Sequence, residues 1–178
     1  MVNDLRQRSI FLIGPMGAGK TTIGRTLATR LDKTFVDADR ELEERTGVSI
    51  SLIFEIEGEA SFRLRESRLL EELTRQPDVV LATGGGAILS AANRQILRSR
   101  GLVIYLRAPL EQLIARTRRD RRRPLLMTAD PAAKLAQLLG ERDPLYRETA
   151  DLIVDTDNLT VRRVVHVIQR DLKSLCAP

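Results

Sequence analysis

The most informative stretch of the 178-residue chain is Gly14-Pro15-Met16-Gly17-Ala18-Gly19-Lys20-Thr21. It matches the pattern G-x-x-x-x-G-K-[ST] at every fixed position, and it lies between an apolar run at 9–13 and a helix-like periodicity at 22–31. Glycines allow backbone N–H groups to converge on phosphate oxygens, and the positive end of the following helix points to the same place. The pattern therefore predicts a nucleotide-binding loop, with Lys20 at the β- and γ-phosphates and the Thr21 hydroxyl on a magnesium ion.

The rest of the chain alternates between strand-like and helix-like segments. Short apolar runs predict strands at 9–13, 34–36, 79–83, 102–106 and 152–155. Helical periodicity predicts helices at 22–31, 39–45, 49–57, 59–75, 90–100, 110–116 and 159–175, with a further helical stretch that starts near residue 130. Continuously apolar strands are typical of a parallel sheet whose two faces are covered by helices. We therefore expect one α/β domain over residues 1–178.

The composition is that of an ordinary globular protein, with 43% hydrophobic and 30% charged residues. The net charge is +5, and most of the basic residues are arginines, which suit carboxylates and phosphates. Aromatic residues make up only 3%, which argues against stacking platforms for single-stranded nucleic acid. The lone cysteine, Cys176, excludes an internal disulfide, and the sequence contains no signal segment and no apolar run long enough to span a membrane. We expect a cytoplasmic protein.

Two aspartates, Asp37 and Asp39, stand at the end of the second apolar run. Because side chains alternate along a strand, the two carboxylates are expected to face the same way, at the sheet edge that borders the ligand crevice in open α/β folds. One of them can hold magnesium through water, and the other can hold an acceptor hydroxyl and take its proton. The alternative is that Asp39 only N-caps the following helix, which leaves Asp37 unexplained.

A run of three glycines and an arginine–glutamate pair are further candidates. Gly84–Gly86 follow the third predicted strand, and because three adjacent glycines cost backbone entropy and have no packing use, we expect main chain to approach a ligand closely there. Arg63 and Glu66 share one face of a predicted helix, so Glu66 can hold Arg63 in place, although a solvated surface pair explains the spacing equally well. Arg142 becomes informative only if the fold brings it to the crevice.

Arginine is densest between Arg116 and Arg123, with six arginines in eight residues. Repulsion between so many like charges resists a fixed packed structure, and two prolines bracket the segment, so we expect a mobile loop over residues 117–131. Two interpretations stay open. The loop is a lid whose arginine neutralises charge on a transferring phosphoryl group, or it is a nucleic-acid arm whose binding depends strongly on salt.

Taken together, the motifs resemble those of the shikimate kinase family, and the resemblance covers essentially the whole chain. The family pattern contains a phosphate loop of the form G-x-M-G-x-G-K-[ST], followed by D-x-D, F-R-x-x-E, G-G-G, R-P-L-L and R-x-P-x-Y. The matching segments, in the same order, are Gly14–Thr21, Asp37–Asp39, Phe62–Glu66, Gly84–Gly86, Arg123–Leu126 and Arg142–Tyr146.

The resemblance implies a role for each candidate residue. The ATP-binding residues would be Gly17, Ala18, Gly19, Lys20, Thr21, Thr22, Arg116 and Arg123, with Arg116 packed against adenine. The shikimate-binding residues would be Asp39, Arg63, Gly84, Gly85, Gly86 and Arg142, with the two arginines on the carboxylate. Asp39 would be the base, Lys20 and Arg123 would act on the phosphates, and magnesium would lie near Thr21 and Asp37.

The chain departs from the family pattern in two places. The lid holds extra arginines where many relatives have glycine or small polar residues, so the arginine that meets the phosphates is not fixed by the motif. The segment 157–161 lacks the proline that some relatives place against adenine, so the sequence does not identify that contact.

We therefore expect a P-loop kinase with a three-layer α/β/α fold, a five-stranded parallel sheet of order 2-3-1-4-5 and a mobile lid. The resemblance implies phosphorylation of the 3-hydroxyl of shikimate by ATP and Mg²⁺, a step toward chorismate and the aromatic amino acids. We expect a monomer that binds neither nucleic acid nor membrane. The nearest alternative is another small-molecule kinase on the same fold, such as a gluconate or nucleoside monophosphate kinase. A nucleic-acid binder and a GTPase-like switch fit the motifs less well.

Overall fold

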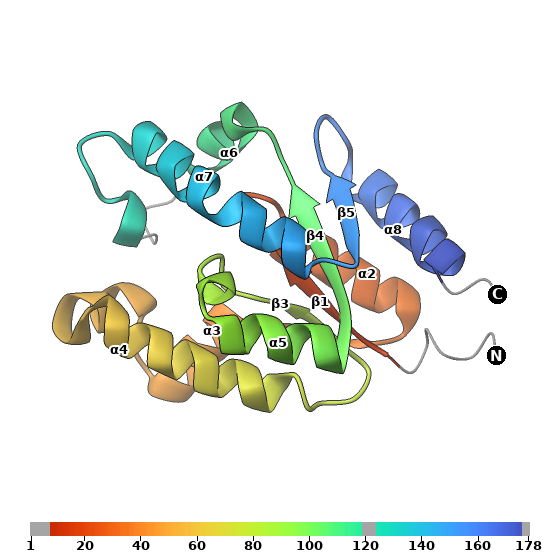
Figure 1. Ribbon diagram of the computed structural model, residues 1–178, viewed down its shortest axis with the longest axis horizontal. Coiled ribbons are helices and arrows are strands. Elements are labelled where there is room, and N and C mark those ends of the chain that lie inside the picture. Colours follow the sequence, from red (N-terminus) through yellow and green to blue (C-terminus); the bar gives the residue numbers. More distant parts are fainter. Residues whose placement is uncertain (1–7, 119–123, 176–178) are drawn as a thin grey trace.

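The fold is built around one parallel sheet. The computed structural model describes residues 8–118 and 124–175, and its five strands follow the order β2-β3-β1-β4-β5 (Figure 1). The strands are β1 (Ser9–Ile13), β2 (Thr34–Asp37), β3 (Val79–Ala82), β4 (Gly101–Arg107) and β5 (Leu152–Asp155). All four strand pairings are parallel, which confirms the predicted order 2-3-1-4-5.

The central strand β1 explains why its sequence is apolar at every position. Its side chains alternate between the two faces of the sheet. Ile10 and Leu12 belong to one buried cluster, and Phe11 and Ile13 belong to the other. All four side chains are buried, so both faces of the strand must be hydrophobic, as in other sheets covered on both sides.

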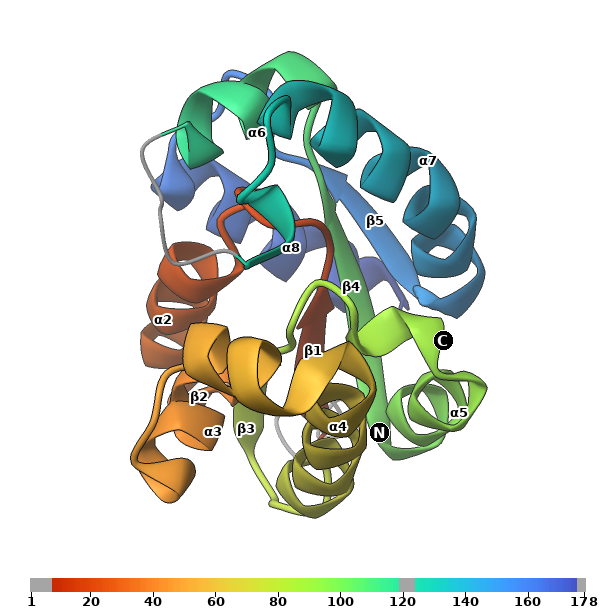
Figure 2. The same ribbon diagram turned by 90° about the vertical axis from the view of Figure 1, so that its left-hand side faces the viewer.

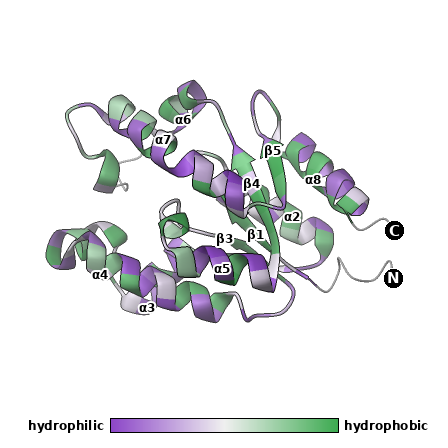
Figure 3. Cartoon of the chain, viewed as in Figure 1, coloured by the Kyte–Doolittle hydropathy of each residue, from purple (hydrophilic) through white to green (hydrophobic). Residues whose placement is uncertain are grey.

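Helices form the two outer layers. The α-helices are α2 (Lys20–Leu31), α3 (Ala38–Thr46), α4 (Ile50–Leu73), α5 (Ala91–Arg100), α6 (Leu110–Thr117), α7 (Pro131–Thr149) and α8 (Val161–Leu175). Two short 3-10 helices are η1 (Ala87–Leu89) and η2 (Pro124–Leu126). Helices α2 and α8 pack on one core cluster, whereas α4 and α5 pack on the other, and α7 contributes to both. Figure 3 shows the expected pattern, with largely hydrophobic strands and helices that alternate between polar and apolar positions. The three-layer fold is confirmed.

Helix ends follow the local signals in the sequence. The side chain of Ser90 accepts a hydrogen bond from the backbone of Asn93, as the prediction of an N-cap required, and Ser49 caps α4 in the same way. Gly58, with φ of 79°, interrupts α4 where the sequence predicts a break between two helices. The two halves of α4 therefore meet at a kink that a residue with a side chain would strain.

One helix contains an internal proline, and one segment differs from the prediction. Helix α7 continues through Pro144, although proline lacks the N–H that would bond the carbonyl of Gly140 one turn earlier. The segment 117–131 is not one uniform loop, because Thr117 ends α6, Pro124–Leu126 form η2 and Pro131 opens α7. Proline is favourable at the first helical position, where its missing N–H has no helical partner in any case.

The polar motifs gather at the carboxyl ends of the strands. The phosphate loop follows β1, Asp37 ends β2 and the three glycines follow β3. Figure 2 looks toward this side of the molecule, where the first half of α4, the turn after β3 and η2 all face the viewer. This is the edge of a parallel α/β sheet where ligands bind. Within the described ranges, no helix is both long and apolar enough to cross a membrane.

Candidate active site

The phosphate loop has the backbone geometry that its glycines predict. Gly14, Gly17 and Gly19 have φ values of 145°, 82° and 92°, a region that residues with side chains rarely adopt. Helix α2 begins at Lys20, directly after the loop. The ammonium group of Lys20 donates hydrogen bonds to the carbonyls of Gly14 at 2.7 Å and Pro15 at 2.9 Å, so it lies across the loop rather than turned away from it.

A cavity of about 650 Å³, the phosphate-loop cavity, opens beside this backbone. Its lining includes most of the predicted nucleotide residues, namely Gly17, Gly19, Lys20, Thr21, Thr22 and Arg116. A smaller neighbouring cavity of about 250 Å³, the side cavity, is lined by Ala18 and Arg116 together with the segment after β5. In that segment, Thr156, Leu159 and Val161 face the side cavity. The predicted nucleotide residues within the described ranges therefore surround two adjoining spaces.

Thr21 and Asp37 are in direct contact. The Thr21 hydroxyl donates a hydrogen bond of 2.6 Å to one carboxylate oxygen of Asp37, and the other oxygen accepts from the backbone of Arg40. Asp37, and not Asp39, is thus the N-cap of α3. The alternative reading of Asp39 as the cap is wrong, because α3 already begins at Ala38 and Asp39 lies inside its first turn.

Asp39 lies in the first turn of α3, so the expectation that it faces the same way as Asp37 along a strand is also wrong. Asp39 nevertheless lines both the phosphate-loop cavity and a second cavity beside it. This second space, the arginine cavity, has a volume of about 70 Å³. Its polar lining residues are Asp39, Arg63, Glu66 and Arg142, with Gly84, Gly85 and Gly86. The fold therefore brings together every predicted substrate residue.

Glu66 holds Arg63 inside the arginine cavity. The guanidinium of Arg63 donates to Glu66 at 2.8 Å and to Glu59 at 2.9 Å. The Glu66 side chain is only 5% exposed, which excludes the alternative of a solvated surface pair. Burial raises the pKa of Glu66 above its usual value, although the charge of Arg63 opposes this shift. Burial alone would lower the pKa of Arg63, but its two acidic partners raise it above the usual value.

The three glycines have a packing role, so the prediction that they have no packing use is wrong. A Cβ atom on Gly84 would overlap the side chains of Glu66 and Asp39, and one on Gly86 would overlap the guanidinium of Arg63. The middle residue, Gly85, packs against the phosphate loop, where a Cβ would lie 3.5 Å from the Gly14 carbonyl. A side chain at either outer position would therefore displace the charged groups that occupy the space of the missing Cβ atoms.

Arg142 is the predicted residue whose position depended most on the fold. It is 4% exposed, on the face of α7 that reaches the arginine cavity. Its Nε atom is buried with no hydrogen-bond partner among the described residues, as is one oxygen of Glu66. Buried polar groups normally find partners, so two such atoms around one cavity indicate a place for a polar ligand.

The lid is only partly described. Arg123 lies outside the described residues, so the structure does not place it. Arg116 at the end of α6 donates to the carbonyl of Gly17 at 3.1 Å and to Gln112 at 2.8 Å. Gln112 in turn donates to Asp157, in the segment after β5. Nothing in the local pattern around Gln112 predicts this role, since its partner lies 45 positions away.

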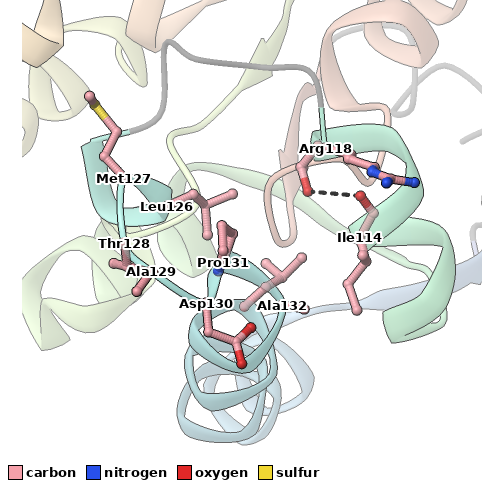
Figure 4. Close-up of a pocket in the computed structure, with 11 residues that line it drawn as sticks. Ile114, Arg118, Leu126, Met127, Thr128, Ala129, Asp130, Pro131 and Ala132 are labelled. Atoms are coloured by element: carbon pink, nitrogen blue, oxygen red, sulfur yellow. Dashed lines mark hydrogen bonds between the residues drawn. The ribbon is translucent and has the colours of Figure 1, made fainter.

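Another cavity lies apart from the predicted residues. It has a volume of about 800 Å³ and is bounded by α6, η2 and the start of α7. Figure 4 shows Ile114, Leu126, Pro131 and Ala132 around it, so its wall is mainly apolar. Because it borders the lid and contains none of the candidate site residues, we do not assign it to the site.

The proximity of Thr21 to Asp37 is consistent with a metal held partly by ligand oxygens. No group of three or more His, Cys, Asp or Glu side chains suited to a metal occurs in the parts of the chain that the structure describes. A hydroxyl and a carboxylate offer hard oxygen ligands, which Mg²⁺ prefers, and Mg²⁺ usually completes its shell with water and phosphate. The donor set therefore fits magnesium better than a metal enclosed by protein ligands.

Comparisons with known proteins agree with this geometry. The family model described as shikimate kinase matches residues 16–173. A shikimate kinase of Bordetella pertussis is 59% identical over 156 residues, which cover 88% of this chain and 74% of that protein. One of Chromobacterium violaceum is 57% identical over 161 residues, which cover 88% of each chain.

Solved structures give the same picture. The shikimate kinase of Acinetobacter baumannii, solved in complex with shikimate, has a TM-score of 0.94 and 48% identity, with 96% of each chain covered. A gluconokinase of Sinorhizobium meliloti has a TM-score of 0.55 and 18% identity, a likeness that concerns the fold alone. The family model matches most of this chain, and the relatives named above are 48–59% identical to it. The chain therefore belongs to the shikimate kinase family.

Proposed function

We propose that this protein transfers the γ-phosphoryl group of ATP to the 3-hydroxyl of shikimate, giving shikimate 3-phosphate and ADP. The observation that carries the proposal is the position of Asp39, which borders both the phosphate-loop cavity and the arginine cavity. A hydroxyl held at Asp39 would lie between the two spaces, where an in-line attack on a γ-phosphate needs it. Membership of the family and the shikimate complex of the Acinetobacter baumannii relative support the choice of substrate.

The arginine cavity suits a small hydroxylated acid. Arg63 and Arg142 would bind the carboxylate, because two guanidinium groups can surround one carboxylate with charge-assisted hydrogen bonds. The buried, unpartnered oxygen of Glu66 and the carboxylate of Asp39 would accept hydrogen bonds from ring hydroxyls. Apolar contacts would come from Phe54, Phe62, Met16, Ile50 and Leu125, which line the same space.

The phosphate-loop cavity suits ATP. The backbone of Gly14–Thr21 would bind the phosphates, and Lys20 would exchange its bonds to loop carbonyls for bonds to phosphate oxygens. Mg²⁺ would lie near Thr21 and Asp37, and when bound it neutralises charge that develops on the transferred group. Adenine would occupy the side cavity between Arg116 and Leu159. Arg123 would complete the phosphate contacts from the lid.

The proposal also covers the domain organisation, the oligomeric state and the location of the protein. We infer a single domain over residues 1–178, because all described elements share one sheet and its two cores. We infer a monomer, because one chain supplies the predicted residues of both cavities, and we keep the cytoplasmic location that the sequence predicts. Light scattering on the purified protein would measure its mass in solution, and a stable dimer would contradict the second inference.

The direct test measures ADP release after addition of single acceptors. We expect turnover with shikimate, and at least about 100-fold lower kcat/KM with an analogue in which the carboxylate is replaced by an uncharged group, because two charge-assisted contacts are lost. Gluconate and nucleoside monophosphates serve as controls for the related kinases of the same fold. Equal turnover of the uncharged analogue, or preferred turnover of another acceptor, would contradict the proposal.

A further inference from the structure

Tyr105 lies between the phosphate loop and the helix that carries Arg142, and it lines neither the phosphate-loop cavity nor the arginine cavity. It lies on β4, is fully buried, and its ring lies beneath the phosphate loop, 3.5 Å from where a Cβ on Gly14 would stand. Its hydroxyl donates a hydrogen bond of 2.7 Å to a carboxylate oxygen of Asp143. Asp143 directly follows Arg142 on α7. One buried phenol is thus bonded to the turn of helix that carries the predicted carboxylate ligand.

A second connection runs through the ring of Tyr105. The ring stacks on Tyr146, with the centroids 4.9 Å apart and the planes at 28°. The hydroxyl of Tyr146 donates a hydrogen bond of 2.5 Å to the carbonyl of Gly85, the middle glycine of the turn in the arginine cavity. Tyr105 therefore contacts α7 on both sides of the proline at 144, once through its hydroxyl and once through its ring.

Helix α7 needs such anchors at this place. Pro144 has no N–H, so the carbonyl of Gly140 lacks its usual helical partner, and the hydrogen-bond ladder is interrupted across the turn that contains Arg142. The Arg142 side chain is buried, and its Nε has no partner among the described residues. Because Nε does not fix its direction, the side chain depends on its hydrogen bond with Tyr146 and on how the helix is fixed to its neighbours.

The chemistry of the Tyr105–Asp143 pair is that of a fixed donor and a charged acceptor. Burial and the neighbouring carboxylate raise the pKa of Tyr105, so its hydroxyl keeps its proton. Burial alone would raise the pKa of Asp143, but hydrogen bonds from Arg147 and Tyr105 lower it below its usual value, so the acceptor stays ionised. Hydrogen bonds to charged groups are among the stronger ones in proteins.

We propose that Tyr105 is a positioning residue for the acidic substrate. Its hydroxyl fixes the turn of α7 that directs Arg142 into the arginine cavity, and its ring fixes the Gly85 carbonyl through Tyr146. The inference rests on the proposed function in one respect, namely that Arg142 binds the carboxylate of the acceptor. Tyr105 lines neither the phosphate-loop cavity nor the arginine cavity, so it acts through Arg142 and the glycine turn.

The test is a double-mutant cycle of wild type, Tyr105→Phe, Arg142→Ala and the double variant, with kcat and both KM values measured. Tyr105→Phe keeps the stacked ring and removes only the hydroxyl. We expect it to lower kcat/KM for shikimate about five- to tenfold, and to leave the KM for ATP within about twofold of wild type. In the Arg142→Ala background the same change should have less than about a twofold further effect, because the residue that it positions is gone.

Matched variants at Asp143 separate positioning from general destabilisation. Asp143→Leu should reproduce Tyr105→Phe, whereas Asp143→Asn keeps an acceptor for the phenol and should stay within about twofold of wild type. Arg147→Gln is the control, because Arg147 is the other partner of Asp143, at 2.5 Å, and is not bonded to Tyr105. These variants also cover the case in which Tyr105→Phe folds poorly.

The outcomes separate the positioning role of Tyr105 from the carboxylate-binding role of Arg142. An equal effect of Tyr105→Phe in both backgrounds, an equal rise in the KM for ATP, or no effect at all would overturn the positioning role. If Arg142→Ala alone leaves kcat/KM for shikimate unchanged, the assignment of Arg142 to the carboxylate is wrong, and this part of the proposed function falls with the inference.

Discussion

In the phosphate loop the binding groups come from consecutive residues, Gly14–Thr21, whereas in the arginine cavity they come from separate elements between Asp39 and Arg142. The loop works through backbone, with three glycines at positive φ that expose N–H groups. The arginine cavity works through buried charged side chains that hold one another in place. Nucleotide binding therefore depends on local backbone geometry, whereas acceptor binding depends on the packing of parts of the chain that are distant in sequence.

The largest expected effect concerns the residue that the two regions share. Asp39→Asn removes a charge between the two cavities and keeps the shape of the side chain. We expect kcat to fall about 100-fold, the lower range for loss of a general base, because most of the catalysis comes from positioning and charge neutralisation. Both KM values should change much less. Steady-state kinetics would measure the split, and full kcat in the variant would remove Asp39 as the base.

The next effect should separate the two regions. Arg63→Ala and Arg142→Ala should each raise the KM for shikimate about 30- to 100-fold, because each removes charge-assisted bonds to a carboxylate, while ATP binding survives. Arg116→Ala should do the reverse and raise the KM for ATP about tenfold, through loss of the contact with adenine.

Initial rates measured with each substrate varied in turn would test this crossover. Arg75→Ala is the control. Arg75 follows α4, the helix of Arg63, and forms an exposed ion pair with Glu71 of that helix, so the variant should leave both KM values unchanged. A parallel loss of ATP affinity in the Arg63 and Arg142 variants would mean that the two regions do not bind separate ligands.

A smaller effect is expected from a single methyl group. Gly86→Ala places a Cβ where the Arg63 guanidinium lies, so the guanidinium must move. We expect about a tenfold loss of kcat/KM for shikimate, with the KM for ATP unchanged. Gly140→Ala is the matched control, because a Cβ there meets nothing within 4 Å and the residue lies inside α7. Equal kinetics for the two alanine variants would show that Gly86 is not needed for packing.

The smallest expected effect is on stability. Burial raises the pKa of Glu66 in the folded protein above its ordinary value of 4.5. The folded state therefore holds this proton at pH values where the unfolded chain has released it, so the Glu66 contribution to the free energy of unfolding falls as pH rises above 4.5. Urea unfolding of wild type and Glu66→Gln across the acidic range would measure this. The difference in free energy of unfolding should vary with pH in that direction, and a constant difference would contradict it.

Much of this organisation could be predicted because its signals are local. The spacing of glycine, lysine and threonine in Gly14–Thr21 fixes the loop, and the continuously apolar strands imply a sheet covered on both faces. Gly58 marks the kink in α4 because its conformation is rare for other residues. The positions of these features depend on neighbours within a few residues, which is the range over which sequence patterns are informative.

The errors have a common physical cause. The alternation of Asp37 and Asp39 predicts a strand that reaches Asp39, but the side chain of Asp37 caps α3, and this capping ends the strand there. The sequence also predicts no packing role for the three glycines, because the side chains that fill their space come from α3 and α4. The burial of Arg142 and the bond from Tyr105 to Asp143 likewise join residues far apart in the chain, and no local pattern records them.

The interlocking of the glycine turn with its charged neighbours also limits how this site can evolve. Gly84 and Gly86 leave the volume that Glu66 and Arg63 fill, so each residue makes its counterpart hard to exchange alone. A change toward a different acceptor that alters one of these residues would therefore also disturb its counterpart. Among the described residues, the space beside Gly14, Gly17 and Gly19 is not filled by an acceptor-binding side chain, so this part of the fold can serve kinases of diverse acceptors.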